Sequence, residues 1–219
     1  MDATYRTTKY ALPLYFICVP TNVNYMVVAM FILETEDSHS IMEALSVIKE
    51  WNPTWKPTYF MCDHAEEEIR ALETIFPESF VYLCDFHREQ SWDRWLTASH
   101  NGVSQSKANI IELFRKIASS MTEEEYEVAK NALMASNHWT ENKRLQTWFE
   151  NTWLKKHKRW VKAYRQCVFN VLVNTNNGVE RQNKALKYEY LDMKKTKSLS
   201  QLLSTILTKY FPDSDIRYE

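Results

Sequence analysis

Three acidic residues lie in contexts that could support chemistry on phosphate groups. They are Asp2 in "DATY", Asp63 in "MCDHAEEEI" and Glu180 in "NTNNGVERQNKALK". Glu180 is the single acid of a short basic stretch, whose cations are Arg181, Lys184 and Lys187. A carboxylate on the same exposed ridge as lysines can bind a metal ion while the lysines hold phosphate groups. These acids are therefore the candidate metal ligands.

Each acid also has a purely structural interpretation. Asp63 with Glu66, and Asn177 with Glu180, fit a helix N-cap followed three residues later by a glutamate. Asp2 could belong to a frayed terminus. The chemical interpretation needs a fold that brings the three acids together.

The helix predicted around Glu180 separates an apolar face from a charged one. Its apolar face repeats at helical spacing and consists of Val179, Leu186 and Tyr190. Glu180, Lys184 and Lys187 lie together about 100° away from that face. We therefore expect the acid and the two lysines to share one exposed ridge.

The first third of the chain predicts four strands and two helices in a defined order, followed by a fifth strand. Strands are expected at 3–8, 13–19, 25–34, 58–63 and 80–84, and helices at 38–50 and around 65–76. Short turns between the first three strands predict an antiparallel meander. A right-handed crossover can then place the fourth strand beside the first, which would bring Asp63 close to Asp2.

The rest of the chain predicts mostly helices. After Phe86, apolar residues repeat at helical spacing, and Thr122 with Glu125 forms a capping box. The many aromatic residues between 145 and 164 are interpreted as core packing rather than as a base-stacking surface.

Composition and charge narrow the function classes. The 219 residues contain only two glycines, which excludes glycine-rich phosphate loops. The longest apolar run, 25–33, is too short to span a membrane. The first residues lack a signal-peptide core, and the four cysteines show no disulfide framework, so we expect a reducing compartment. Residues 143–197 hold fourteen lysines and arginines against four acids, which favours a polyanionic partner over a merely solvated helical surface.

Four blocks of the chain resemble the catalytic core of Mutator-like element (MULE) transposases. They are "DATYRTTKYALPLYFICV", "YFMCDHAEEEIRALETIFPES", "VYLCDFHREQSWDRW" and "NTNNGVERQNKALK". The resemblance implies an α/β, RNase H-like fold with a mixed five-stranded sheet in the order β-β-β-α-β-α-β-α. It also implies a core of residues 1–96 and 174–219, with an all-helical insertion at 97–173 before the last catalytic helix.

The resemblance implies that Asp2, Asp63 and Glu180 are the acids of a DDE-type enzyme. Three carboxylates could hold two Mg²⁺ or Mn²⁺ ions for DNA strand cleavage and strand transfer. The expected partner is DNA, as transposon ends and as target, in the nucleus; assembly into a homo-oligomer stays open. DNA contacts are expected from Lys155, Lys156, Lys158, Arg159, Arg181, Lys184 and Lys187.

Cys84 and His87 match the Cys/His pair of the same family. No second Cys-x-x-Cys or His-x₃₋₅-His pair accompanies them, which argues against structural zinc. Cys84 could instead be an auxiliary, buried residue at a strand end. His87 could be a hydrogen-bonded histidine in a first helical turn, or a catalytic residue that contacts the scissile phosphate or orients an acid.

The chain departs from the family at its beginning. Asp2 is the second residue, whereas the family's first acid lies inside its strand, after several apolar positions. The family's zinc-containing DNA-recognition region and its SWIM zinc finger are also absent from this chain. The sequence therefore leaves two functions open: an active transposase core, or a domesticated, non-catalytic DNA-binding or protein-interaction module. A structure-specific RNA nuclease is a third, weaker alternative.

Overall fold

The computed structural model describes residues 1–22, 24–165, 175–191 and 197–216. The chain forms two compact units. The first unit comprises Met1–Val81 and Asn176–Glu219, and the second comprises Tyr82–Thr175. The expected domain boundaries, at 96 and 174, stay a prediction. Cys167 and the basic residues 194 and 195 lie outside the described residues.

The first unit opens with an antiparallel meander, as the sequence predicts. Its strands are β1 (Asp2–Thr4), β2 (Leu14–Pro20) and β3 (Tyr25–Ile32), in the order β1-β2-β3. Asp2 pairs with Phe16, and Leu14 pairs with Ile32. Because directly paired residues point to the same face of a sheet, Asp2 shares a face with Phe16.

The central strand β2 is buried on both faces. Leu14 and Phe16 belong to one core cluster, together with Val179, Leu186, Leu191, Leu202, Ile206 and Tyr210. Tyr15 and Ile17 alternate with them, so they point to the opposite face, and they are also buried. This position of β2 puts Asp2 on the face of the sheet that the carboxyl-terminal helices cover.

Two helices and two further strands complete the amino-terminal part. They are α1 (Ser38–Trp51), β4 (Tyr59–Cys62), α2 (Glu66–Ile75) and β5 (Phe80–Leu83). Asp37 caps α1 by accepting hydrogen bonds from the backbone amides of His39 and Ser40. The predicted inward residues Ile41, Leu45 and Ile48 are buried, and α1 packs against α2.

The structure departs from the expected single sheet. Within the described residues, the five strands form two sheets, one of β1, β2 and β3 and one of β4 and β5. A hydrogen bond of 2.9 Å from the amino group of Met1 to the carbonyl oxygen of Met61 nevertheless links the start of β1 to β4. Because β1 has only three residues, this contact does not extend into a ladder. The mixed α/β class and the element order are confirmed.

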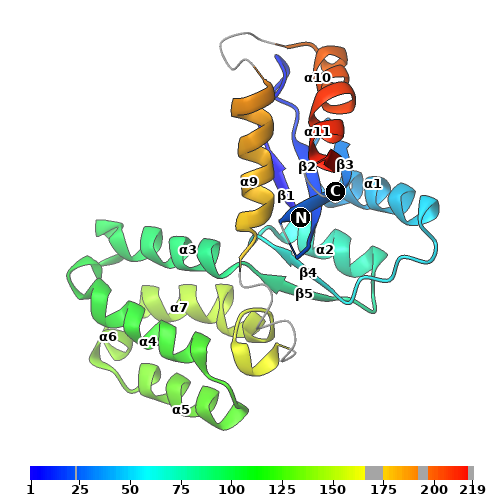
Figure 1. Cartoon of the computed structure of the whole chain (residues 1–219). Coiled ribbons are helices and arrows are strands. Elements are labelled where there is room, and N and C mark those ends of the chain that lie inside the picture. The colour runs from blue at the N-terminus through cyan, green and yellow to red at the C-terminus, as the bar shows by residue number, and fades with distance from the viewer. Residues whose placement is uncertain (23, 166–174, 192–196, 217–219) are drawn as a thin grey trace. The chain divides into compact units, whose positions relative to one another are not determined.

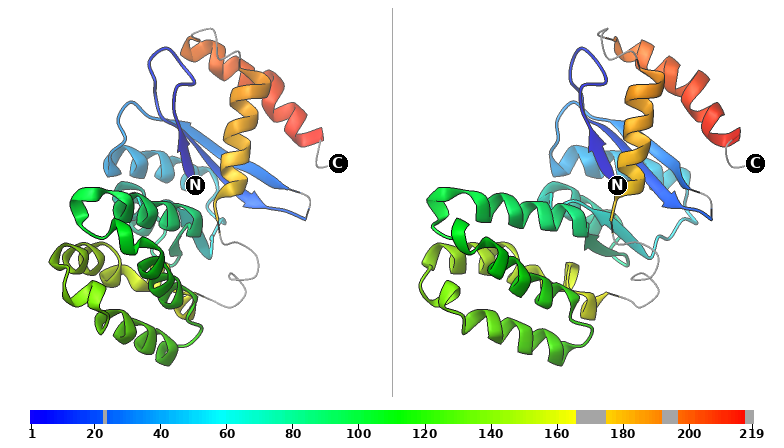
Figure 2. Two further views of the ribbon diagram at one scale, coloured as in Figure 1. Left: turned by 90° about the vertical axis from the view of Figure 1, so that its left-hand side faces the viewer. Right: turned by 60° about the vertical axis from the view of Figure 1, so that its left-hand side comes forward.

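Helices follow in the carboxyl-terminal part of the first unit. They are α9 (Asn177–Ala185), the π-helical turn η5 (Leu186–Tyr190), α10 (Leu199–Thr205), the π-helical turn η6 (Ile206–Tyr210) and α11 (Phe211–Ile216). α9 contacts all three strands of the meander, and Figures 1 and 2 show it lying beside β1. The expected core residues Val179 and Leu186 are buried, and Tyr190 is half-buried.

A close approach between α9 and β3 explains one of the two glycines. A Cβ atom on Gly178 would lie 2.1 Å from ring atoms of Tyr25. Real Cβ contacts are never that short, so only glycine allows α9 to lie this close to the strand. The amino-terminal end of α9 is thereby held against the sheet.

The second unit is helical among its described residues after β5. It contains α3 (Asp85–Thr97), η1 (Ser99–Asn101), η2 (Ser104–Ser106), α4 (Lys107–Ser119), α5 (Glu123–Met134), α6 (Asn137–Thr140), α7 (Lys143–Thr152), η3 (Leu154–Arg159) and η4 (Lys162–Tyr164). The aromatic residues form its core, as predicted: Trp92, Phe114, Phe149, Trp153 and Trp160 are fully buried and in mutual ring contact. The described residues contain no helix long and apolar enough to cross a membrane.

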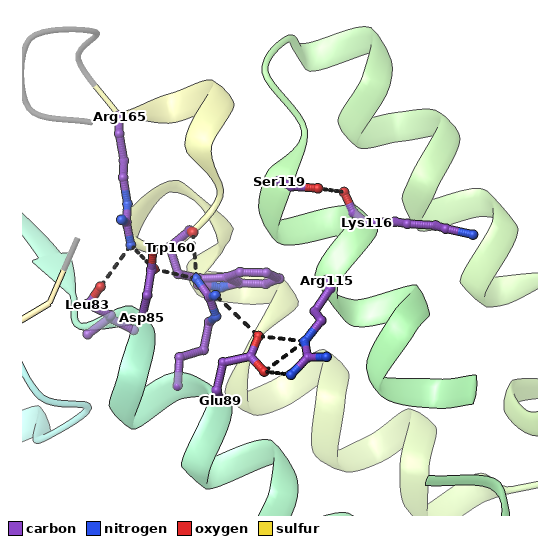
Figure 3. A network of polar contacts seen from close by, with 9 residues as sticks. Leu83, Asp85, Glu89, Arg115, Lys116, Ser119, Trp160 and Arg165 are labelled. Carbon is purple, nitrogen blue, oxygen red and sulfur yellow. Dashed lines mark hydrogen bonds and ion pairs between the residues drawn. The ribbon is translucent and has the colours of Figure 1, made fainter. Parts of the chain in front are cut away.

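Two buried arginines of the second unit share one carboxylate (Figure 3). Asp85 Oδ1 accepts hydrogen bonds from Arg88 Nη1 at 2.6 Å and from Arg165 Nη2 at 2.9 Å. Arg165 Nη2 also donates to the carbonyl oxygen of Leu83. At the surface, Glu89 pairs with Arg115 at 2.7 Å. Asp85 thus balances charge in the interior, while the pair of Glu89 and Arg115 is partly solvated.

Candidate metal centre

Asp2 and Asp63 are each placed by a strand of the first unit. Asp2 opens β1, and Asp63 follows β4 directly. Both side chains are half-buried. The hydrogen bond from Met1 to Met61 holds the residues just before these two acids in register. The expected proximity of the first strand and the fourth therefore has a direct structural basis.

Two asparagines connect the acids to α9. Asn176 Nδ2 donates a hydrogen bond of 2.7 Å to Asp63 Oδ1. Asn183 Nδ2 donates one of 2.9 Å to Asp2 Oδ2. Both asparagines are buried, and hydrogen bonds to a charged acceptor are stronger than neutral ones. Both aspartates, which belong to the first 63 residues, are therefore attached to a helix that begins at Asn177.

Glu180 lies between these two asparagines on the same side of the helix. Positions 176, 180 and 183 are separated by four and three residues, the spacing that places side chains on one face. The Glu180 side chain is half-buried. Asp2 and Asp63 thus each bond to an asparagine on the helix face that also carries Glu180. Their role as metal ligands stays a prediction.

α9 is held in this position by Gln182. The side-chain amide of Gln182 donates to the carbonyl oxygen of Tyr25, and its Oε1 accepts from the hydroxyl of Tyr210 at 2.8 Å. Tyr210 in turn stacks on Phe16, with ring centroids 5.7 Å apart. Phe16 is also the residue that pairs with Asp2 between β2 and β1. The contacts of Gln182 and Tyr210 therefore hold α9 over the face of the sheet that carries Asp2.

A fourth acid, Glu68, lies in the interior near these residues. Its side chain projects from the first turn of α2 and is 4% exposed. Burial, together with the negative charges of Asp2, Asp63 and Glu36, raises the pKa of Glu68 to about 8, although the amino group of Met1 acts in the opposite direction. Asp2 and Asp63 therefore make the ionisation of Glu68 less favourable.

Glu36 is held beside this cluster by two tyrosines. Glu36 Oε1 accepts hydrogen bonds from the hydroxyls of Tyr5 and Tyr15. Burial raises the pKa of Tyr15, and the charge of Glu68 contributes to that rise. Tyr15 therefore lies near both glutamates, on the face of β2 opposite to Phe16.

The donor atoms of the centre suit a hard divalent cation. The candidate ligands are all carboxylates, the ligand type that Mg²⁺ and Mn²⁺ prefer. Within the described residues, Asn183 Oδ1 and Glu68 Oε2 are buried oxygens that accept no hydrogen bond. Buried acceptors without a donor cost free energy, and a cation would offset that cost. The residues present therefore fit the ion that the resemblance implies.

The two capping interpretations do not describe what is observed. The N-cap residue of α2 is Ala65, and that of α9 is Asn176; neither side chain makes a capping hydrogen bond. Asp63 precedes its helix by two further residues, and the amide of Asn176 reaches Asp63 instead of the helix backbone. Capping thus does not account for Asp63 or Glu180. Thr122, by contrast, caps α5 as predicted.

The expected DNA-binding residues fall in both units. In the first unit, Arg181 and Lys184 are exposed and line a pocket of about 290 Å³, whereas Lys187 is half-buried. Burial lowers the pKa of Lys187, and Asp2 opposes that shift, so Lys187 lies near the acid. In the second unit, η3 carries the other cations: Lys155 and Lys158, which are exposed, and Lys156 and Arg159, which are half-buried. Their contacts with DNA stay predictions.

Cys84 and His87 belong to the second unit. Cys84 is buried at the N-cap position of α3, and His87 is half-buried in the first turn of that helix. The His87 ring makes an edge contact with Phe86 at 5.2 Å. These positions agree with the expected strand end and first helical turn. A catalytic role of His87 remains a prediction.

The first part of the chain matches the model of a known family. Residues 1–82 match the RNaseH-like domain of zinc finger SWIM domain-containing protein 1/3. The matched residues hold Asp2, Asp63 and Glu68, and they end before α9. The predicted RNase H-like fold is thus supported for this part of the chain, and the match carries no evidence of catalysis. No curated protein matches the chain significantly.

Sequence reasoning missed two asparagines of this centre and a buried acid on α2. Asn176 and Asn183 lie at helical spacing from Glu180, so the ridge that carries the acid already contained them. Glu68 falls between Ala65 and Leu72 on the inward face of α2. A glutamate on an otherwise apolar face was the signal that could have identified it.

Proposed function

We propose that the chain is the catalytic core of a Mutator-like transposase, which cleaves and joins DNA strands with two Mg²⁺ or Mn²⁺ ions. One observation carries the proposal: the two asparagines of α9 that hydrogen-bond to Asp2 and Asp63 lie on either side of Glu180. If Glu180 were only a solvated surface acid, the asparagines on either side of it would not need to bond to Asp2 and Asp63. The RNase H-like match of residues 1–82 supports the same assignment.

Asp2, Asp63 and Glu180 would hold the ions. Bound there, the ions would activate a water molecule or a 3′-hydroxyl as nucleophile and stabilise the leaving oxygen. The chain's own residues orient the ligands: Asn183 fixes the carboxylate of Asp2, and Asn176 fixes that of Asp63. Such fixed ligands matter because a site that is loose by about 1 Å loses most of its activity.

The exposed cations of α9 would bind the phosphate backbone next to the acids. Arg181 and Lys184 lie one and four residues after Glu180, on the solvent side of the same helix. Phosphate contacts of this kind position a strand without reading its sequence. The exposed aromatic ring of Tyr188 lines the same pocket and offers a surface on which a base can stack.

A second function follows from the same hydrogen bonds. Because amide donors already satisfy one oxygen of each aspartate, the acids could serve only to join α9 to the sheet. The chain would then be a domesticated module that binds DNA or a protein without cutting. This alternative predicts that replacing Glu180 has no effect beyond stability.

Cleavage of terminal-repeat DNA in Mg²⁺ or Mn²⁺ distinguishes the two functions. We expect nicking by the wild-type chain and its loss in Glu180→Gln, because glutamine cannot supply a charged ligand. Glu189→Gln is the matched control, since Glu189 is an exposed acid nine residues further along. Equal nicking by wild type and Glu180→Gln, or none by either while DNA binding persists, would reject the enzyme and favour the module.

A further inference from the structure

The pocket of about 290 Å³ beside α9 is formed by two segments of the first unit. One wall is α9 with the turn η5, and it contributes Arg181, Lys184 and Tyr188. The other wall is Asn24, in the turn between β2 and β3. Pockets for drug-sized ligands have volumes of about 300–1,000 Å³. This pocket therefore suits a small group such as a single nucleobase.

Tyr188 is the feature of this pocket that a phosphate site alone does not explain. The residue is 74% exposed. Within the described residues, its ring contacts no other ring and no cation, and its hydroxyl makes no hydrogen bond. Tyr190, two residues later, packs edge-on against Tyr210 with ring centroids 5.3 Å apart. The turn η5 thus directs one tyrosine towards the core and leaves the other facing solvent.

The two cations of the pocket lie beside the exposed ring. Arg181, Lys184 and Tyr188 are separated by three and four residues, the spacing that aligns side chains along one helix face. Both cations are exposed, and neither forms an ion pair within the described part of the chain. The acid Glu189 also lines the pocket, so its lining carries two positive charges and one negative charge. The pocket therefore favours an anionic ligand.

The turn that carries Asn24 holds this side chain in one orientation. Asn24 Oδ1 accepts a hydrogen bond of 2.9 Å from the backbone amide of Tyr25, and the carbonyl oxygen of Asn24 accepts one from the hydroxyl of Thr21. Because Oδ1 is engaged within the turn, Nδ2 is the atom left to donate to a ligand. An amide donor in this position complements the acceptor atoms on the edges of nucleobases.

Cations next to an uncovered aromatic ring are the components of a site for an unpaired nucleotide. In such sites the cations hold the phosphates and a base stacks on the ring, which requires a base that is free of its neighbours in a duplex. We propose that this pocket binds an unpaired nucleotide of a DNA strand, with its base on Tyr188 and its phosphates on Arg181 and Lys184. The proposal rests on the proposed function, because it takes DNA as the nucleic acid that lies along α9. It adds that the DNA is single-stranded at this position.

Binding of a short oligonucleotide to the whole chain tests the proposal. A chelator is present, so that neither cleavage nor a bound metal ion is needed. A fluorescent base analogue in the strand reports stacking, and anisotropy measures the affinity for the single strand and for its duplex. We expect wild type to quench the analogue in the single strand. Tyr188→Ala should abolish the quenching and weaken single-strand binding about 10- to 100-fold, the effect of losing one stacked base, with little change for the duplex.

Two further variants show whether the ring at this position is responsible. Tyr188→Phe keeps the ring and should bind and quench like wild type. Tyr10→Ala is the matched control, because Tyr10 is another exposed tyrosine of the first unit and lines a different pocket. It should leave the quenching and both affinities unchanged.

The inference and the proposed function can fail separately. Equal single-strand binding by wild type and Tyr188→Ala, an equal loss for single strand and duplex, or tighter binding of the matching RNA strand would overturn the inference. None of these results bears on nicking that depends on Glu180, which is measured separately. Conversely, single-strand binding that depends on Tyr188, without any nicking, would support the pocket and reject the enzyme.

Discussion

Asn183 donates a 2.9 Å hydrogen bond to Asp2, a residue 181 positions earlier in the chain. The bond joins the helix that carries Glu180 to the strand that carries the first acid. Because its acceptor is a carboxylate in a partly buried setting, it contributes more than an exposed polar contact would. The geometry of the candidate centre depends directly on this pair.

Removing the amide of Asn183 should destabilise the first unit. We expect Asn183→Ala to lower the free energy of unfolding by about 1–3 kcal/mol, because a charged acceptor loses its donor inside the protein. Urea denaturation followed by fluorescence measures the change. Asn177→Ala is the control, since Asn177 is exposed on the same helix. A loss of stability as large in the control would show that the bond to Asp2 has no special role.

The contact between Gly178 and Tyr25 should make an ordinarily favourable substitution unfavourable. Alanine is better than glycine in a helix interior by about 1 kcal/mol. Here its Cβ would meet the ring of Tyr25 at 2.1 Å, so we expect Gly178→Ala to destabilise the chain by about 1–3 kcal/mol. Thermal unfolding measures the effect.

A second substitution tests whether the ring of Tyr25 causes the expected destabilisation by Gly178→Ala. In a Tyr25→Ala background the ring is gone, and Gly178→Ala should then be neutral or stabilising. A destabilisation of equal size in both backgrounds would rule out the ring as its cause.

Glu68 should make the stability of the ion-free chain depend on pH. Its folded-state pKa of about 8 lies above the ordinary value of 4.5, so between these values the folded chain keeps a proton that the unfolded chain has lost. Stability must therefore fall as the pH rises through this window, by up to about 1.4 kcal/mol per pH unit. The acids Asp2, Asp63 and Glu36 and the amino group of Met1 face Glu68 and share in the effect.

Denaturation midpoints between pH 5 and 8, in the presence of a chelator, test this dependence. We expect the midpoint of wild type to fall more steeply than that of Glu68→Gln, with Glu67→Gln following wild type. Parallel curves for wild type and Glu68→Gln would mean that Glu68 ionises as an ordinary surface acid does.

Asp85 should be the most sensitive charged residue of the second unit. Its carboxylate faces Arg88 and Arg165, whose side chains are 7% and 0% exposed. Asp85→Asn removes the carboxylate that both buried cations share and leaves Arg88 only its 3.7 Å ion pair with Glu89, so we expect a loss of about 3–5 kcal/mol in the free energy of unfolding. Arg115→Gln removes a pair that is 63% exposed on its cationic side, and we expect less than about 1 kcal/mol there. Calorimetry of both variants compares the two directly, and similar losses would contradict the burial argument.

DNA binding through α9 should depend on salt. If Arg181 and Lys184 each neutralise a phosphate, replacing both by glutamine reduces the slope of log affinity against log salt by about 2. Fluorescence anisotropy between 50 and 200 mM salt measures this slope. A matched double variant at the exposed Lys155 and Lys158 gives the contribution of the second unit. An unchanged slope for the α9 variant would remove these residues from the DNA surface.

The spacing of apolar residues predicted most of the helices and strands, because it reflects which side chains are buried. Ile41, Leu45 and Ile48 repeat on one face and are buried in α1, and the aromatic residues Phe149, Trp153 and Trp160 form a core as expected. The division of the strands into two sheets was not predicted. Pairing between distant strands depends on hydrogen bonds that leave no local pattern, and β1 offers only three residues for them.

The acids were identified from their sequence contexts, but their attachments were not. Asn176 and Asn183 are ordinary polar residues in the sequence, and their hydrogen bonds cross 113 and 181 positions. Glu68 lies in a run of three glutamates, two of which are exposed. Composition alone does not show which of the three glutamates points inward. The helical spacing of Glu68 from Ala65 and Leu72 does show it.

The order of the acids along the chain also determines when the centre can form during synthesis. Asp2 and Asp63 are translated before α9, which follows only after residues 82–175. Until then the aspartates lack the amides of Asn176 and Asn183, and Glu180 is missing altogether. The hydrogen bonds that join both aspartates to α9 can therefore form only once that helix has been synthesised.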